Sequence, residues 1–195
     1  MCKVKIQCLI GLFFFLSSYI FFSQISLNTQ KYVDWAHWFN LVGAVFLLSF
    51  NSIFPRNNIS KVASFFTSLG VIAHIGLCTI DFILWSFGDN DTARNELKQH
   101  ISNTPLILYP FIIIGPSLLF IGLATHALNF IKTNTISSLM VIVGAPLVGI
   151  SFFLLKNGNL MLVSCFMFTI GLALLLFRKG NHKEEIEIVE KIGPN

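Results

Sequence analysis

Six apolar segments divide the 195-residue chain, and each approaches the roughly 20 residues that a helix needs to cross the hydrocarbon core of a bilayer. They lie near 7–26, 37–54, 62–87, 105–129, 137–155 and 160–177. This pattern predicts an all-α, polytopic integral membrane protein. We expect a bundle of six transmembrane helices within residues 1–177, followed by a polar cytoplasmic tail over 178–195.

The composition agrees with this fold class and excludes several others. Hydrophobic residues make up 54% of the chain and charged residues only 11%, against about 25% charged in soluble domains. One core could not hide so much apolar surface, which argues against a soluble enzyme, a nucleic-acid-binding domain or a disordered chain. We therefore expect the lipid bilayer as the main partner, with a membrane-protein partner or a second copy of the chain in addition, and no nucleic acid.

The distribution of Lys and Arg predicts the orientation of the bundle. With the N-terminus inside, nine of the 13 basic residues fall on the inner side and the rest on the outer side, which satisfies the positive-inside rule. The first segment lacks a small-x-small cleavage pattern, so we interpret it as an uncleaved helix and place both termini in the cytoplasm. The small size and the composition rich in Ile, Phe, Asn and Lys favour a bacterial inner membrane.

The third segment carries a polar face. Its members step by three or four residues and so share one side of a helix: Thr67, Gly70, His74, Cys78, Asp81 and Trp85. Asp81 is the only acidic residue deep inside any segment, about 9 Å below the outer end of its helix. Asn40, Tyr109 and His37 have similar or shallower depths. The sequence thus predicts an intramembrane polar cluster of these four residues, with His74 nearer mid-membrane.

Two interpretations of the Asp81 cluster stay open. It binds a cation, a proton or the polar head group of a ligand, because polar groups inside a membrane often mark functional sites. Alternatively, it is a set of hydrogen bonds between helices with no ligand.

Prolines interrupt the fourth and fifth segments. Pro110, Pro116 and Pro146 each remove a backbone donor, which predicts kinks and makes the three positions candidate hinges. Ordinary kinks without any motion are the alternative, since proline is common in membrane helices. In the polar stretch 88–104, Leu97 and Ile101 predict a short helix lying on the membrane surface.

Metal and cofactor chemistry is not indicated. His37, His74 and His126 lie at different depths, so no two could ligate one haem iron, and no His, Cys and carboxylate set has metal-ligand spacing. We expect no cofactor and no metal, and we interpret His37 and His126 as interfacial side chains with a wet tip.

No catalytic motif occurs, and no Lys lies within the six segments. We therefore expect a non-catalytic accessory or ligand-binding membrane protein. The alternative is a secondary transporter or cation-coupled carrier that uses the polar face around Asp81.

Overall fold

The computed structural model describes residues 2–23 and 30–177. Helices account for nearly all of them: α1 (Cys2–Ser23), α2 (Gln30–Leu47), α3 (Phe50–Ile53), α4 (Asn58–Ser86), α5 (Asp91–Ser102), α6 (Pro105–Ile107), the π-helical turn η2 (Leu108–Ile113), α7 (Gly115–Leu128), α8 (Thr135–Phe153) and α9 (Gly158–Leu176). The predicted tail over 178–195 lies outside the described residues.

Six spans of the described chain are helical, long and apolar enough to cross a membrane, and no strand occurs in that part of the chain. This confirms the all-α prediction and the number of candidate spans: Lys3–Ser23, Tyr32–Ile53, Asn58–Ser86, Pro105–Leu128, Thr135–Phe153 and Gly158–Leu176.

Two of the six spans are divided. The second consists of α2 and α3 with a turn between them, whereas the sequence predicts one helix. The fourth consists of α6, η2 and α7, in agreement with the interruption that its prolines predict. Helix α2 also begins at Gln30 rather than at 37, because the helix continues past Asp34 and Trp35. An apolar run in the sequence shows only the part of a helix that suits the hydrocarbon core of a bilayer. The helix itself can extend further through polar residues.

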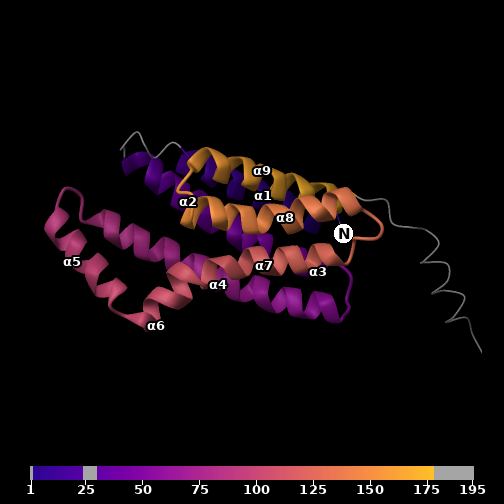
Figure 1. Ribbon diagram of the computed structural model, residues 1–195, viewed down its shortest axis with the longest axis horizontal. Helices are drawn as coiled ribbons and strands as arrows, with labels where there is room; N and C mark the ends of the chain where they lie inside the picture. The colour runs from indigo at the N-terminus through magenta and orange to yellow at the C-terminus, as the bar shows by residue number, and fades with distance from the viewer. Residues whose placement is uncertain (1, 24–29, 178–195) are drawn as a thin grey trace, which may run out of the picture.

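The long helices form a closed ring. Helix α4 packs against α7, α1 against α2 and α8 against α9, and smaller contacts join α9 to α1, α2 to α4 and α7 to α8. Helix α1 begins and α9 ends at the same end of the bundle, near α3, while α5 lies at the opposite end (Figure 1). We call these the α3 end and the α5 end.

Glycines set how closely the helices of a pair approach. A Cβ atom at Gly70 of α4 would collide with the backbone nitrogen of Leu119, and one at Gly122 of α7 with that of Thr67. On the pair α1 and α2, a Cβ atom at Gly43 would lie 2.6 Å from the backbone nitrogen of Phe15. Small residues let helix backbones touch, and this packing is a main source of stability between membrane helices.

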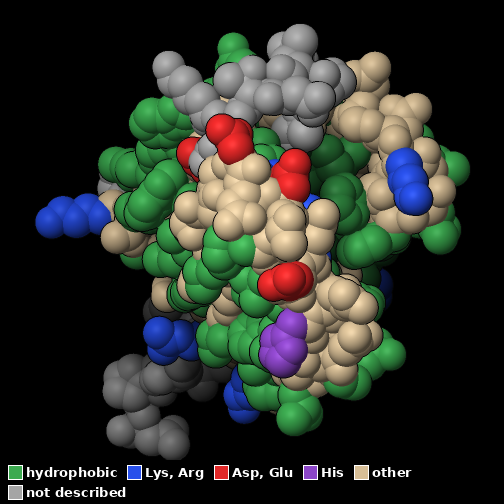
Figure 2. Space-filling view, turned by 90° about the vertical axis from the view of Figure 1, so that its left-hand side faces the viewer, with side chains coloured by type: hydrophobic (Ala, Val, Ile, Leu, Met, Phe, Trp, Pro, Cys, Tyr) green, Lys and Arg blue, Asp and Glu red, His purple; other side chains and the backbone are tan. Residues whose placement is uncertain are grey.

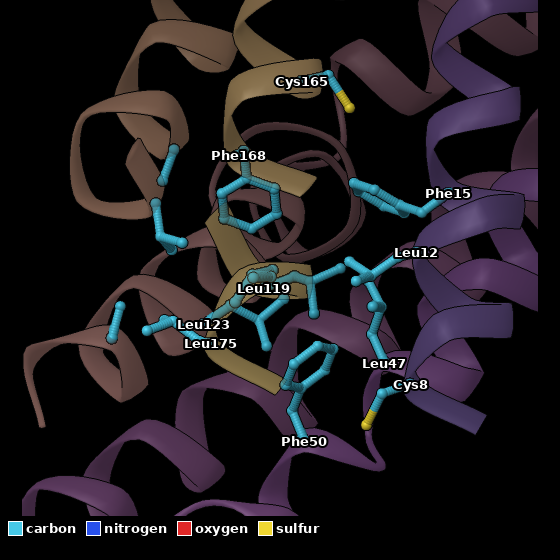
Figure 3. Close-up of a cluster of buried hydrophobic side chains, with 14 of the residues drawn as sticks. Cys8, Leu12, Phe15, Leu47, Phe50, Leu119, Leu123, Cys165, Phe168 and Leu175 are labelled. Carbon is cyan, nitrogen blue, oxygen red and sulfur yellow. The ribbon is translucent and has the colours of Figure 1, made fainter. Parts of the chain in front are cut away.

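The core fills the ring toward the α3 end. Figure 3 shows side chains from several helices meeting there, among them Phe15 of α1, Phe50 of α3, Leu119 and Leu123 of α7, and Phe168 of α9. All five are fully buried.

At the α5 end the chain is more polar. The predicted short helix in 88–104 is present as α5, with Asn90 as its N-cap accepting a hydrogen bond from the Ala93 amide. Arg94 pairs with Asp91 and lies over the ring of Trp85. Exposed acidic residues, among them Asp89 and Glu96, belong to this end, where Figure 2 shows acidic side chains scattered among hydrophobic ones.

Candidate functional site

The fourth span is broken where the sequence places its prolines. Pro110 lies inside η2, and the Ile114 amide donates to the Tyr109 carbonyl at 2.9 Å, one residue further back than in an α-helix. The residue at the end of this turn is Gly115. A larger residue does not fit there, because a Cβ atom would collide with the Pro110 carbonyl and with Ala73 of α4. The π-helical turn therefore offsets α6 from α7 while α7 stays packed on α4.

A partly open cavity of about 720 Å³ lies inside the ring of helices. Its walls come from α1, α2, α4, η2, α7, α8 and α9, and α7 contributes residues along its whole length, from Pro116 to Leu128. Most of the lining is apolar, including Phe22, Phe120 and Phe152. This volume lies in the range of roughly 300–1,000 Å³ typical of small-molecule sites.

Two polar side chains form an ion pair in the cavity wall. Nε2 of His37 on α2 lies 2.7 Å from Oδ2 of Asp81 on α4. Nδ1 of His37 lies 2.8 Å from the Val33 carbonyl, which can only accept, so Nδ1 carries a proton. One further proton must then lie between Nε2 and Oδ2. The pair holds it either as imidazolium and carboxylate or as imidazole and carboxylic acid, and both forms have zero net charge.

Asn40 and His74 line the same cavity and are almost fully buried, with exposed fractions of 5% and 2%. Oδ1 of Asn40 has no hydrogen-bond partner among the described residues. His74 donates from Nδ1 to the Gly70 carbonyl at 2.9 Å, which leaves Nε2 as an acceptor. Buried polar groups normally have partners, so the unpartnered oxygen of Asn40 indicates room for a ligand.

Aromatic rings connect the two histidines. The Phe22 ring packs edge-on against His37 with centroids 5.1 Å apart, and it contacts Tyr19 at 6.0 Å. Tyr19 contacts Phe120 at 6.5 Å, and Phe120 contacts His74 at the same distance. The polar groups of the cavity thus lie within a continuous aromatic wall.

The structure brings together four of the five predicted site residues: Asp81, His74, Asn40 and His37. It does not bring Tyr109 to them, because Tyr109 is 50% exposed on η2 and does not line the cavity. Of the candidate hinges, Pro116 and Pro146 line the cavity and Pro110 does not.

The first helix supplies site residues that the sequence analysis missed. Tyr19 and Phe22 line the cavity from α1. One signal was available, since Tyr19 is the single tyrosine in the first apolar segment. No sequence signal distinguishes Phe22 from the many other phenylalanines of that segment.

His126 is not the interfacial side chain that the sequence suggested. It is fully buried at the α3 end, where its ring packs on Phe54 and its Nε2 donates to Oδ1 of Asn51 at 3.0 Å. Asn129 continues this cluster by donating to the Ser60 hydroxyl and to the His126 carbonyl. These bonds join α3, α4 and the end of α7 and contain no charged group, so the cluster has a structural role.

The described residues contain no group of three or more His, Cys, Asp or Glu side chains placed to hold a metal ion. In fold the chain is an all-helical bundle of six membrane-length spans around a mostly apolar cavity with a polar, proton-holding pair. Comparisons with protein-family models, with curated proteins and with solved structures give no significant match.

Proposed function

We propose that this chain is a multi-pass membrane protein that binds a small amphipathic molecule in its internal cavity. The observation that carries the proposal is the uneven lining of the cavity. Most of its walls are apolar, and the few polar side chains among them include the His37–Asp81 pair, Asn40 and His74. An apolar pocket with a few convergent polar groups is the usual form of a small-molecule site.

The unpartnered Asn40 supports this proposal over purely structural hydrogen bonding between helices. A buried carbonyl without a partner costs about 1–3 kcal/mol, and a ligand that donates a hydrogen bond removes that cost. The polar cluster around His126 also holds a buried atom without a partner among the described residues, Nδ1 of His126, but His126 does not line the cavity and bonds from helix to helix.

Binding is tested with dodecanol and dodecane, which share a chain and differ in one hydroxyl group. We expect native mass spectrometry of protein released from lipid nanodiscs to show one dodecanol per chain and markedly weaker binding of dodecane. Asn40→Leu has nearly the same volume and removes the amide, so it should weaken dodecanol binding about tenfold. Equal binding of both probes, or of neither, would contradict the proposal.

A carrier that moves such a ligand across the membrane is a second candidate. It is favoured by one observation: Pro116, in the first turn of α7, and Pro146, inside α8, both border the cavity. Uptake of a radiolabelled amphiphile into proteoliposomes separates the two candidates, because a binding protein retains its ligand without accumulating it in the vesicle.

We also propose that the six spans cross a bacterial inner membrane with both termini in the cytoplasm. The bias of Lys and Arg supports this orientation. With the four native cysteines replaced by alanine, a single cysteine on α5, Gln99→Cys, should react with an impermeant maleimide in intact cells. Lys132→Cys, in the turn between α7 and α8, should react only after permeabilisation. The reverse pattern would contradict the orientation.

A further inference from the structure

We infer that the His37–Asp81 end of the cavity binds the positively charged head group of a lipophilic organic monocation, and that each cation displaces the single proton that the two side chains share. This inference rests on the proposed function, because it names the ligand class for the same cavity.

Charge balance leads to this exchange. With its shared proton, the His37–Asp81 pair is neutral whichever side chain holds that proton. A monocation added to the neutral pair would leave a net positive charge in a mostly apolar cavity, which is costly. Departure of the proton leaves neutral imidazole and the Asp81 carboxylate, and the carboxylate then balances the cation.

The proton and the bonds can be followed atom by atom. Before binding, the proton lies between Nε2 of His37 and Oδ2 of Asp81. On binding it leaves for water, and His37 keeps its Nδ1 proton on the Val33 carbonyl. No covalent bond forms and no electron is transferred, so the exchange is one cation bound for one proton released.

No other charged group in the cavity wall competes for this role. The titratable lining residues besides the pair are Tyr19 from α1 and His74 from α4. Cys78 lies one turn before Asp81 on α4, and Asp34 lies one turn before His37 on α2. Among the described residues, the lining contains no Lys or Arg, and Asp81 is its one carboxylate.

The aromatic wall is suited to the same head group. The faces and edges of Tyr19, Phe22 and Phe120 line the cavity between the two histidines. Aromatic rings attract cations, most strongly where water is excluded, and quaternary ammonium groups are bound by aromatic cages in this way. The apolar remainder of the cavity accommodates an alkyl chain.

The test counts protons. Dodecyltrimethylammonium is added to the full-length protein in weak buffer with a pH indicator, because this cation carries no dissociable proton of its own. We expect about one proton released per cation bound, and cation affinity that rises by about tenfold per pH unit while the pair holds its proton. Dodecanol, with the same chain and no charge, should bind without releasing a proton.

Asp81→Asn removes the carboxylate and the shared proton. We expect it to abolish proton release and to weaken cation binding about 100-fold while dodecanol still binds. His100→Gln, at an exposed position on α5, is the matched control and should release protons as the unsubstituted protein does. If Asp81→Asn does not fold, the proton count of the unsubstituted protein decides the question.

Cation binding without proton release would overturn the inference, and so would release that persists in a folded Asp81→Asn protein. If dodecanol binds and the cation does not, the inference fails while the proposed function stands. If neither probe binds, both fail.

Discussion

The two sides of α7 differ in how they meet the rest of the bundle. The side facing α4 places Gly122 against the backbone of Thr67 and Leu119 against Gly70, with no room for a further methyl group. The other side, which includes Ser117, Ile121 and Ala124, lines a cavity of about 720 Å³. One helix therefore serves both as a rigid support and as a wall of the cavity. The close contact on one side lets the other side remain unfilled without loss of the fold.

Two of the three buried histidines of the described chain, His126 and His37, show the same contrast. His126 donates to a neutral amide, packs on Phe54 and does not line the cavity. His37 pairs with the carboxylate of Asp81 in the cavity wall. The surroundings of the two histidines, and not their presence in apolar segments, distinguish them.

The largest effect is expected from a substitution that disrupts the packed side of α7. Gly122→Val places side-chain atoms where the Thr67 backbone lies, so α4 and α7 must separate. We expect a loss of stability of about 3 kcal/mol or more, seen as a large drop in melting temperature and in monodisperse protein on gel filtration. The control is Gly149→Ala on α8, where an added Cβ meets nothing within 4 Å. If both variants melt like the unsubstituted protein, the packed side does not support the fold.

The next prediction distinguishes the role of His126 from that of His37. His126→Ala removes a buried ring and leaves Asn51 without its donor, so we expect a loss of about 3 kcal/mol in unfolding free energy. Dodecanol affinity, measured by native mass spectrometry, should not change, because His126 does not line the cavity. A variant with normal stability and impaired binding would reverse the assigned roles.

Filling the cavity side of α7 should weaken ligand binding and leave the stability of the fold unchanged. Ala124→Leu adds apolar volume inside the cavity, so dodecanol affinity should fall about tenfold while the melting temperature is maintained. Ala124 lies two residues from Gly122, which makes the pair a direct comparison of the two sides. Unfolding of the Ala124→Leu protein would mean that this side is packed as well.

The smallest effect concerns the predicted site residue that lies outside the cluster. Tyr109→Phe removes a half-exposed hydroxyl group, and we expect stability to stay within about 0.5 kcal/mol and dodecanol affinity to stay unchanged. A clear loss of binding would show that Tyr109 belongs to the site.

The sequence predicted the six spans and most of the polar cluster because both depend on local properties. The length of each apolar run can be read from the sequence, and Asp81 stands out because so few residues of the chain are charged. Depth along each helix then placed Asn40 and His37 near it. Depth says nothing of rotation about a helix axis, and this is why Tyr109 was included in the cluster and is half exposed in the structure.

The features that were missed depend on how the helices close into a ring. The contribution of Tyr19 and Phe22 requires α1 to face α2 and α7 across the cavity, and no pattern within α1 encodes that contact. The burial of His126 likewise depends on Asn51, which is distant in sequence. Pro110 lacks a backbone amide and so predicts a break in the fourth span, which the structure has as the π-helical turn η2. The position at which η2 ends depends on the close packing of Gly115 on Ala73, which the sequence does not reveal.

Photolabelling tests most directly whether an amphiphile occupies the cavity along α7. A dodecanol analogue with a diazirine on its chain is irradiated with the protein in nanodiscs, and the labelled residues are read by peptide mass spectrometry. We predict labels on cavity residues of α7 and α8, such as Ala124 and the buried Ala145, that an excess of dodecanol suppresses. Labels confined to exposed residues that do not line the cavity, such as Phe13, Phe65 and Val163, and unaffected by dodecanol, would contradict the account.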